Sequence, residues 1–335
     1  MAEASCGRKV GVPAVVSAII VNWNGGARLA ACLESLAEQV YSPLEIVVID
    51  NASTDGSTEG IADRFPAARL VRNEVNVGLC AALNQGLALT TGPYVLTLNP
   101  DVRLTPSFVS ELVKGMEASG AGSATGKLLR PEVGPGGGHL IDSTGLRLNR
   151  ARRPQDRGRG EEDRGQYDAP GEVFGACGAA AFHRRAMLLD IAIGGRAWDE
   201  GLFAYYDDVD IAWRARWRGW RCIYVPSAVA YHDRAGAETL RKRARAPARR
   251  RDQVLAIANR YRLLVKNESW ATLLPDLGYI LGSDLPRWLY LTLRAPWLWA
   301  WVLLFCRGVP ETLAARRAIH ARRSVPWEDL RRWFR

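Results

Sequence analysis

Several signatures that would assign a function at once are missing from the sequence. It has six cysteines and four histidines among 335 residues. Neither a CxxC pair nor a His/Cys cluster occurs, so no zinc site is predicted. The turn after the first apolar segment, at residues 22–26, contains no GxGxxG, which argues against a dinucleotide dehydrogenase. The absence of a GxxxxGK motif argues against a P-loop NTPase.

Long apolar stretches are also few. The first residues hold no apolar stretch of the signal-peptide type, and we expect no signal peptide. The cysteines are scattered, and several lie in apolar runs. This placement is typical of reduced core residues in a cytosolic protein.

The tail is the most apolar part, but it is interrupted. Residues 288–306 are rich in Trp, Leu and Tyr, and Arg294 and Pro296 break the run. What remains is shorter than the roughly 20 apolar residues of a transmembrane helix. Trp and Tyr with flanking Arg favour an interfacial helix, which predicts a cytoplasmic protein peripheral on the inner face of the cell membrane. A packed helical appendage or a homo-oligomer contact is the alternative.

What the sequence contains indicates a large α/β domain. Hydrophobic residues make up 48%, which is ample for a core. Strand-like apolar segments alternate with helical patterns, at residues 15–21, 29–36, 44–50, 68–72, 79–89 and 94–98. This alternation predicts βαβ crossovers and a mostly parallel sheet.

Charge and composition suggest how the chain is divided. Residues 150–171 are rich in Arg, Gly, Glu and Asp without apolar periodicity, which predicts a mobile loop within a catalytic domain at 1–240. A basic linker and a helical, membrane-associated region then occupy 241–335. The net charge of +10 favours anionic ligands, and the basic stretch 241–251 is either a solvated linker or attracted to anionic lipid or pyrophosphate. No nucleic-acid module accompanies it, so no nucleic-acid partner is predicted.

Polar residues follow the predicted strands at the edge where α/β sheets bind ligands. Asp50 can accept hydrogen bonds from a ribose or a base, or it can cap the turn that follows. Asn22 and Asn51 lie beside it. Asp101, in Asn99-Pro100-Asp101, can hold Mg²⁺ or Mn²⁺ against a diphosphate, or it can belong to an Asx-Pro turn.

Three carboxylates occur within four residues, at Asp207, Asp208 and Asp210. The helical spacing of residues 204–217 places them near a helix start, which favours negative charge. A carboxylate held there can act as general base toward an acceptor hydroxyl, and N-capping needs only one of the three. His232 ends a strand-like segment and either completes a metal site or is structural.

Seven ordered segments resemble family 2 glycosyltransferases, in particular the bacterial rhamnosyltransferase-like branch. They lie at residues 17–25, 45–57, 73–78, 98–101, 174–180, 198–210 and 224–232. The resemblance extends from residue 15 to about residue 265. It implies a GT-A fold with a mostly parallel sheet, a nucleoside-diphosphate sugar donor, a divalent cation and inversion at the anomeric carbon.

The resemblance also implies roles for single residues. Asp50 would bind the base of the donor, with further donor-binding residues at Asn22, Asn51, Asn76, Gly78 and Asn99. Asp101 and His232 would bind the metal, Mg²⁺ or Mn²⁺. Asp208 would be the catalytic base, with Asp207 and Asp210 beside it and Asp210 in a supporting role.

Three positions depart from the family pattern. Asn99 stands where the family's DxD motif has its first acid, which leaves one charge fewer for the metal. Asp207 stands where a Glu is frequent, so its reach toward the acceptor is shorter. Residues 80–84 replace a Gly-Gly-Asn stretch, which changes the detail of the donor pocket.

The leading hypothesis is a glycosyltransferase that acts on a cell-envelope glycan or a polyprenyl-diphosphate-linked acceptor. A rhamnose donor such as dTDP-rhamnose is the first choice, on the resemblance alone. A second hypothesis is a catalytically weak subunit that binds nucleotide sugars or lipids in an assembly complex. A nucleotidyltransferase would carry a basic Gly-rich loop after the first strand, and residues 22–26 contain no Arg or Lys.

Overall fold

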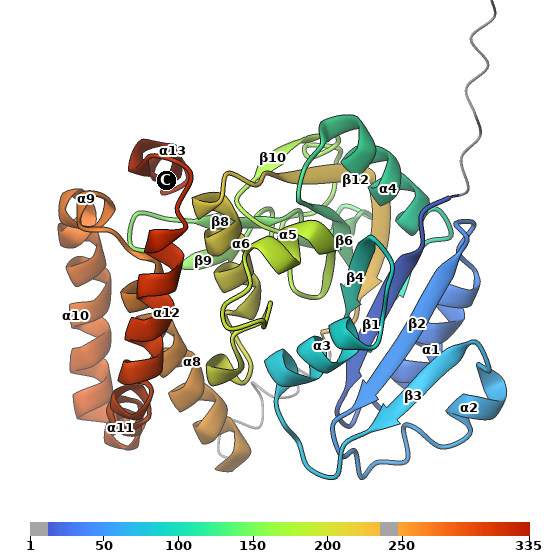
Figure 1. Ribbon diagram of the computed structural model, residues 1–335, viewed down its shortest axis with the longest axis horizontal. Helices are drawn as coiled ribbons and strands as arrows, with labels where there is room; N and C mark the ends of the chain where they lie inside the picture. Colours follow the sequence, from blue (N-terminus) through green and yellow to red (C-terminus); the bar gives the residue numbers. More distant parts are fainter. Residues whose placement is uncertain (1–12, 235–246) are drawn as a thin grey trace, which may run out of the picture.

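The computed structural model describes residues 13–234 and 247–335. Cys6 and residues 241–246 of the basic stretch lie outside these ranges. The first half alternates strands and helices, as the apolar pattern predicts: β1 (Val16–Asn22), α1 (Ala27–Ala37), β2 (Leu44–Asp50), α2 (Ile61–Arg64), β3 (Ala68–Arg72), α3 (Leu79–Ala88) and β4 (Tyr94–Leu98). These strands pair in parallel in the order β4-β1-β2-β3, on the right in Figure 1.

The second half extends the same sheet from the other side of β4. Its elements are β5 (Val102–Leu104), α4 (Phe108–Ser119), β6 (Ser123–Val133), β7 (His139–Ser143), β8 (Leu146–Leu148), β9 (Pro154–Asp156), β10 (Gly171–Val173), β11 (Ala180–Arg184), α5 (Arg185–Asp190), η1 (Glu200–Leu202), α6 (Asp207–Trp217) and β12 (Cys222–His232). The full order is β10-β12-β6-β11-β4-β1-β2-β3. The strand β11 runs antiparallel to both of its neighbours, and β12 pairs in parallel with β6.

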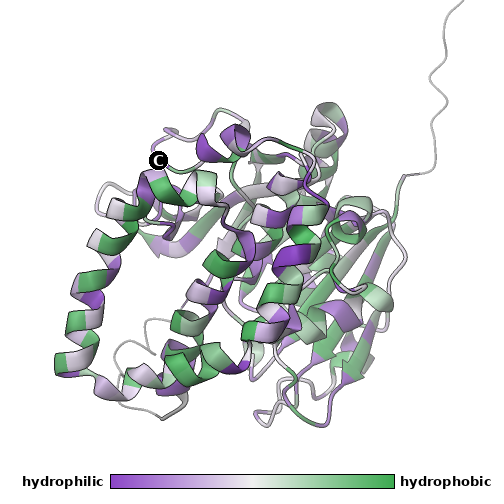
Figure 2. Ribbon diagram, turned by 60° about the vertical axis from the view of Figure 1, so that its left-hand side comes forward, coloured by the Kyte–Doolittle hydropathy of each residue, from purple (hydrophilic) through white to green (hydrophobic). Residues whose placement is uncertain are grey.

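The core lies on both faces of this sheet. One cluster packs α1 and α4 against strands, through residues such as Leu33, Ile20 and Phe108. A second packs α3 and α5 on the other face, around Ile19, Leu83 and Met187. Green colour along the strands in Figure 2 follows this burial.

The chain ends in a group of helices, drawn on the left in Figure 1. They are α8 (Pro247–Asn267), α9 (Trp270–Leu273), η2 (Leu274–Asp276), α10 (Leu277–Arg294), η3 (Pro296–Trp299), α11 (Ala300–Arg307), α12 (Val309–Ala321) and α13 (Trp327–Arg331). Arg294 and Pro296 end one helix and begin a short turn, as the sequence predicts.

These helices form the predicted C-terminal appendage, and they pack against the sheet domain. One hydrophobic cluster joins Trp213 of α6 to Leu263 of α8, Ile319 of α12 and Phe334 near the C-terminus. Trp213 is fully buried, so the tail covers a surface that would otherwise expose a large aromatic side chain to water. The helix that carries the aspartate cluster is thus held between the sheet and the tail.

Residues 150–171, for which we predicted a mobile loop, contain β9 and a buried arginine. The side chain of Arg152 is shielded from solvent and pairs with Glu268 at 3.1 Å and with Asp276 at 2.8 Å. The segment lacks apolar periodicity because its buried contacts with the tail are made by charged side chains. The pattern of apolar residues therefore gave no signal for this packing.

Candidate active site

The predicted donor-side residues meet at the carboxyl ends of β1 and β2. Asn22 and Asp50 are the last residues of these two strands and lie opposite each other in register. The Asn22 side-chain amide donates to Asp50 Oδ1 at 2.8 Å and to Ser57 Oγ at 2.9 Å. The side chains of Asn22 and Asp50 are buried. The parallel register thus brings together two residues that are 28 positions apart.

Asp50 also caps the turn that follows it, which is the structural alternative that the sequence allowed. Its Oδ1 accepts from Ser53 Oγ at 2.6 Å, and its Oδ2 accepts from the Ser53 backbone N–H at 3.2 Å. Asn51 continues the network, because its amide donates to the Gly78 carbonyl at 3.1 Å. The donor-side residues are therefore already fixed by one another.

The loop that contains Asn76 and Gly78 connects the donor side to the acceptor side. Asn76 Oδ1 accepts from the Gly78 backbone N–H at 2.9 Å. Gly78 has a φ of +90°, and a Cβ there would lie 2.6 Å from the Phe203 ring. No other residue fits, because both the backbone conformation and the ring contact require glycine.

Asp101 and His232 lie side by side at the end of β12. His232 Nε2 is 3.4 Å from Asp101 Oδ1, and its Nδ1 lies 2.8 Å from Oδ2 of the buried Asp142. Burial lowers the pKa of His232, but hydrogen bonds and charges from both carboxylates outweigh burial and raise it to about 9. The arrangement therefore favours a positive charge between Asp101 and Asp142.

This arrangement fits a divalent cation. Within residues 13–234 and 247–335, no group of three His, Cys, Asp or Glu side chains gathers to hold a metal ion. Two protein ligands are nevertheless enough where substrate phosphates complete the shell. The contact from Asp142 to Nδ1 leaves Nε2 of His232 directed at Asp101, as in carboxylate–histidine–metal groups.

Asp208 is held by backbone donors at the start of α6. Its Oδ1 lies 2.8 Å from the Val209 backbone N–H, and its Oδ2 accepts from the Gly178 N–H at 3.1 Å. Gly178 permits this approach, because a Cβ there would lie 3.2 Å from the Asp208 side chain. Burial raises the pKa of Asp208 and of Asp207, and neighbouring carboxylates raise both further. Carboxyls of this kind are suited to accept a proton near neutral pH.

One cleft brings the two halves of the site together. It is an open cleft of about 1650 Å³, including space open to solvent, and it is lined by the predicted residues Asn99, Asp207, Asp208 and His232. The β8–β9 hairpin also lines it, through Arg147 and Gln155, as do Tyr205 and Tyr206. Seven predicted residues do not line this cleft: Asn22, Asp50, Asn51, Asn76, Gly78, Asp101 and Asp210.

Asp210 of α6 does not line the cleft. It is buried, and its carboxylate pairs with Arg214 at 2.8 Å and with Lys266 of α8 at 2.8 Å. Burial alone would raise its pKa, but these two charges outweigh burial and lower it to about 2. Asp210 therefore joins α6 to the tail, and we place it apart from the cleft residues with which the sequence grouped it.

Asn259 of α8 is one of the residues that hold the loop before α6. The Asn259 side-chain amide donates to the carbonyls of Leu202, Ala204 and Tyr205, at 2.7 to 3.1 Å. This loop has positive φ at Phe203, Tyr205 and Tyr206, a conformation that non-glycine residues adopt at a cost of roughly 1–3 kcal/mol each. The three hydrogen bonds from Asn259 offset that cost and fix the approach to Asp207.

Four residues of this arrangement were missed by the sequence analysis. Asp142 and Arg234 surround His232, with Arg234 Nε 2.6 Å from Asp142 Oδ1, and Lys266 and Asn259 fix α6 and its loop. A single Asp near the end of a strand-like segment was the only available signal for Asp142. Nothing in the spacing of the tail residues indicates contact with a helix about 50 positions earlier.

The fold is the GT-A fold. Residues 17–191 match the sequence model of Glycosyl transferase family 2, and the chain belongs to that family, within its rhamnosyltransferase-like branch. The predicted family and the predicted fold class are thereby confirmed. The chain is thus a transferase of sugar groups.

Relatives and solved structures agree with this assignment. The N-acetylglucosaminyl-diphospho-decaprenol L-rhamnosyltransferase of Mycobacterium tuberculosis is 27% identical over 246 residues, which cover 66% of this chain and 76% of that protein. The S. aureus TarS 1–349 structure superposes with a TM-score of 0.56 at 16% identity, covering 91% of this chain and 86% of TarS. The mannosyltransferase PcManGT from Pyrobaculum calidifontis, in complex with GDP-Man and Mn²⁺, gives a TM-score of 0.51 at 21% identity over 94% and 77%.

Proposed function

We propose that the protein transfers a sugar from a nucleoside-diphosphate sugar to an acceptor hydroxyl, with inversion at the anomeric carbon. A single observation carries the proposal: Asn99, His232 and Asp208 line one cleft. The diphosphate side and the base side of a displacement reaction therefore face the same space. An inverting displacement needs this arrangement and no covalent intermediate on the protein.

The donor side is formed by strand ends and the loops after them. Asp50 and Asn22 are proposed to receive the nucleoside, with Asn51, Asn76 and Gly78 beside them and Asn99 toward the diphosphate. This placement follows the rule that ligands bind beyond the carboxyl ends of parallel strands. The existing hydrogen bonds of Asp50 keep its carboxylate oriented before a ligand arrives.

Asp101 and His232 are proposed to hold Mg²⁺ or Mn²⁺ together with phosphate oxygens of the donor. When bound, the cation would stabilise the negative charge of the leaving diphosphate. Asp142 keeps the His232 ring oriented through Nδ1, so that Nε2 stays directed at Asp101. Mn²⁺ in the PcManGT complex supports a divalent cation for this fold.

Asp208 is the proposed base. The backbone N–H groups of Val209 and Gly178 fix both of its oxygens, so the carboxylate lies in one orientation at the cleft wall. It can take the proton from an acceptor hydroxyl as that oxygen attacks the sugar. Asp207 also lines the cleft, and after burial the negative charge of Asp208 raises the pKa of Asp207, so that Asp208 ionises first.

The proposed donor sugar is rhamnose, from dTDP-rhamnose, and the proposed acceptor is a polyprenyl-diphosphate-linked or other cell-envelope glycan. The name of the mycobacterial relative, an L-rhamnosyltransferase that acts on a diphospho-decaprenol, supports both choices. The large volume of the cleft is compatible with an acceptor that is more than one sugar ring long.

Donor and metal binding are expected to raise thermal stability together. In a panel of nucleotide sugars, the true donor at 100 times its Kd should stabilise the protein by about 2.7 kcal/mol with Mn²⁺ present, by mass action. EDTA should remove most of this effect, and Asp101→Asn should lose the Mn²⁺-dependent part. Differential scanning fluorimetry measures the melting temperature of the wild type with donor and Mn²⁺, of the wild type with donor and EDTA, and of Asp101→Asn with donor and Mn²⁺.

The control for this panel is Asp63→Asn, which changes an exposed carboxylate of α2. It should respond like the wild type. If no nucleotide sugar raises the melting temperature, the proposed function is wrong. If EDTA leaves the donor effect unchanged, the proposed metal role of Asp101 and His232 is wrong.

We also propose that α10 contacts an anionic membrane surface. Five exposed leucines recur every four residues along it: Leu277, Leu281, Leu285, Leu289 and Leu293. Tyr279 and Tyr290 are exposed as well, and Arg294 is exposed at the end of the helix. A leucine row with aromatic and basic neighbours is typical of a helix that lies in a membrane interface.

Among the helices of residues 13–234 and 247–335, none alone is long and apolar enough to cross a membrane. One pair, Pro296–Arg307 and Val309–Ala321, has the length and composition of a span only when the two helices are taken together, and it is bent by 56°.

Two glutamates in the leucine row are expected to weaken membrane binding. Leu285→Glu with Leu289→Glu should lower co-sedimentation with phosphatidylcholine/phosphatidylglycerol vesicles by at least about tenfold, because two leucine side chains lose their apolar burial. Leu189→Glu, at a leucine 58% exposed on α5, is the matched control. Equal sedimentation of both variants would rule out α10 as the contact surface.

A further inference from the structure

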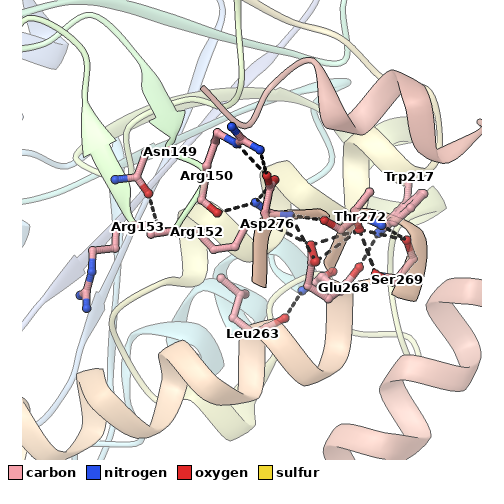
Figure 3. A network of polar contacts seen from close by, with 12 residues as sticks. Asn149, Arg150, Arg152, Arg153, Trp217, Leu263, Glu268, Ser269, Thr272 and Asp276 are labelled. Atoms are coloured by element: carbon pink, nitrogen blue, oxygen red, sulfur yellow. Dashed lines mark hydrogen bonds and ion pairs between the residues drawn. The ribbon is translucent and has the colours of Figure 1, made fainter. Parts of the chain in front are cut away.

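Next to the cleft, the β8–β9 hairpin is joined to the tail by a charge network that is balanced. Figure 3 shows Arg150 and Arg152 directed at Asp276 and Glu268. Arg150 pairs with Asp276 at 2.6 Å, and Arg152 pairs with both carboxylates. Two guanidinium groups thus face two carboxylates, and the network needs no further anion.

The neighbouring cluster is not balanced. Arg153 and Arg260 share one carboxylate, that of the buried Asp284 on α10, at 2.8 and 3.1 Å. Arg287, one helical turn further along α10, is half-buried. Within the two described ranges, Arg287 has no hydrogen-bond or ion-pair partner. Three cations therefore surround a single anion, with two positive charges in excess.

The three cations lie close together, because Arg153 and Arg260 both pair with Asp284 and Arg287 follows Asp284 by about one turn of α10. Burial lowers the pKa of Arg153, and the positive charges of Arg260 and Arg287 lower it further. Burial raises the pKa of Tyr206, and the same three arginines oppose that rise. Tyr206 lines the cleft two residues before Asp208, and Pro154, next to Arg153, lines it as well. The unbalanced cluster therefore lies at the rim of the cleft.

We propose that Arg153 and Arg287 bind the diphosphate group of a lipid-linked acceptor. The inference rests on the proposed function and names the part of the acceptor that the rim recognises. A guanidinium pair binds phosphate oxygens with charge-assisted hydrogen bonds. The acceptor sugar would extend from the rim toward Asp208, and the apolar chain would leave along the leucine row of α10. The β8–β9 hairpin and α10 are tied together by Arg153–Asp284, so the two recognition surfaces have a fixed relation.

The test uses inorganic pyrophosphate and the full-length protein in EDTA. Isothermal titration calorimetry should show Arg287→Gln binding pyrophosphate about 10- to 100-fold more weakly than the wild type, the usual effect of losing one charged hydrogen-bond donor. Arg69→Gln, which changes an exposed arginine of β3, should bind as the wild type does. Arg287→Lys should regain part of the affinity, because the positive charge is restored.

The outcomes separate three possibilities. Unchanged pyrophosphate affinity in Arg287→Gln, with an unchanged melting temperature, would overturn the proposal. A loss of binding to phosphatidylglycerol vesicles without a loss of pyrophosphate affinity would assign the cluster to a lipid headgroup and would also overturn it. Sugar transfer by the wild type is measured separately, so a protein that binds pyrophosphate through Arg287 but uses no nucleotide sugar contradicts only the proposed function.

Discussion

Asp208→Asn is expected to lower kcat for sugar transfer by about 10³-fold, within the usual range for loss of a general base. The amide is isosteric and cannot accept the proton of the acceptor hydroxyl. The backbone N–H groups of Val209 and Gly178 bond to different oxygens of Asp208, so the single amide oxygen keeps only one of these two hydrogen bonds. The residues proposed for donor binding lie on other elements, so the fold and donor binding should persist. Donor KM and the melting temperature should therefore change little while kcat falls.

The pKa of Asp208 should determine how the rate of sugar transfer by the wild type depends on pH. Burial and the charge of Asp156 raise the pKa of Asp208 to about 6. The base acts when deprotonated, so the rate should fall as the pH drops through this value, by about tenfold between pH 7 and pH 5. An ordinary Asp, with a pKa of about 3.9, would show no fall in that range.

Asp207→Asn is the matched control for the base. It makes the same chemical change in the same cleft, at a carboxylate for which the structure shows no bond to Gly178 or Val209. Its kcat should fall less than that of Asp208→Asn. The acid side of its pH profile should stay in place, because Asp207, with a pKa of about 7, is still protonated when Asp208, with a pKa of about 6, ionises. If kcat falls further in Asp207→Asn than in Asp208→Asn, Asp207 rather than Asp208 is the base.

The second large effect is expected at Lys266, far from the cleft in sequence and outside the family match. Its side chain is fully buried, and its ammonium group pairs with Asp210 at 2.8 Å and with Asp199. Lys266→Met would leave the buried Asp210 with a single cationic partner, Arg214. Breaking such a buried network typically costs about 3–5 kcal/mol. Chemical denaturation should show this loss.

Activity should fall together with stability in Lys266→Met, because Asp199 begins the turn that leads into the Asp207 loop and Asp210 lies on α6. Adding Asp210→Asn should not restore the stability, because the buried Arg214 would then lose the carboxylate with which it pairs. Lys114→Met, at an exposed lysine paired with Glu111, should cost less than about 1 kcal/mol. A Lys266→Met protein as stable as Lys114→Met would show that the tail is not needed to hold α6.

The contacts between the tail and α6 affect where the C-terminal boundary of the catalytic domain is placed. We propose that the part of the tail from α8 onward folds together with the sheet domain, rather than as a separate region after residue 240. Asn259, Lys266 and Asn267 of α8 each bond to α6 or to the loop before it. Removal of the tail to test membrane binding would therefore also disturb the active site, whereas substitutions on the exposed face of α10 would not.

Much of the fold could be predicted from local sequence. The segments at residues 44–50, 68–72 and 94–98 are strands with those same bounds, because buried parallel strands are continuous apolar runs. Helix α6 begins at Asp207 rather than at residue 204, because three preceding residues adopt positive φ. Helical spacing does not reveal that conformation, since Asn259 of a distant helix stabilises it.

The candidate site was predictable only where its residues lie at strand ends or in a recurring motif. Asn22, Asp50, Asp101 and Asp208 met one of these conditions. Asp142 did not, because its contact with His232 depends on how β7 and β12 are placed around β6. The proximity of Arg153 and Arg287 could not be predicted either, because these residues are 134 positions apart in the sequence and only the packing of the tail brings them together.

The most direct test of the account is nucleoside diphosphate release from the nucleotide sugar that stabilises the protein most, with acceptor and Mn²⁺ present. Wild-type protein should release the nucleoside diphosphate in step with sugar transfer, and Asp208→Asn should bind the same donor but release it about 10³-fold more slowly. Equal release rates in the two proteins, or no release from any nucleotide sugar by the wild type, would contradict the assignment of Asp208 as the base of a nucleotide-sugar glycosyltransferase.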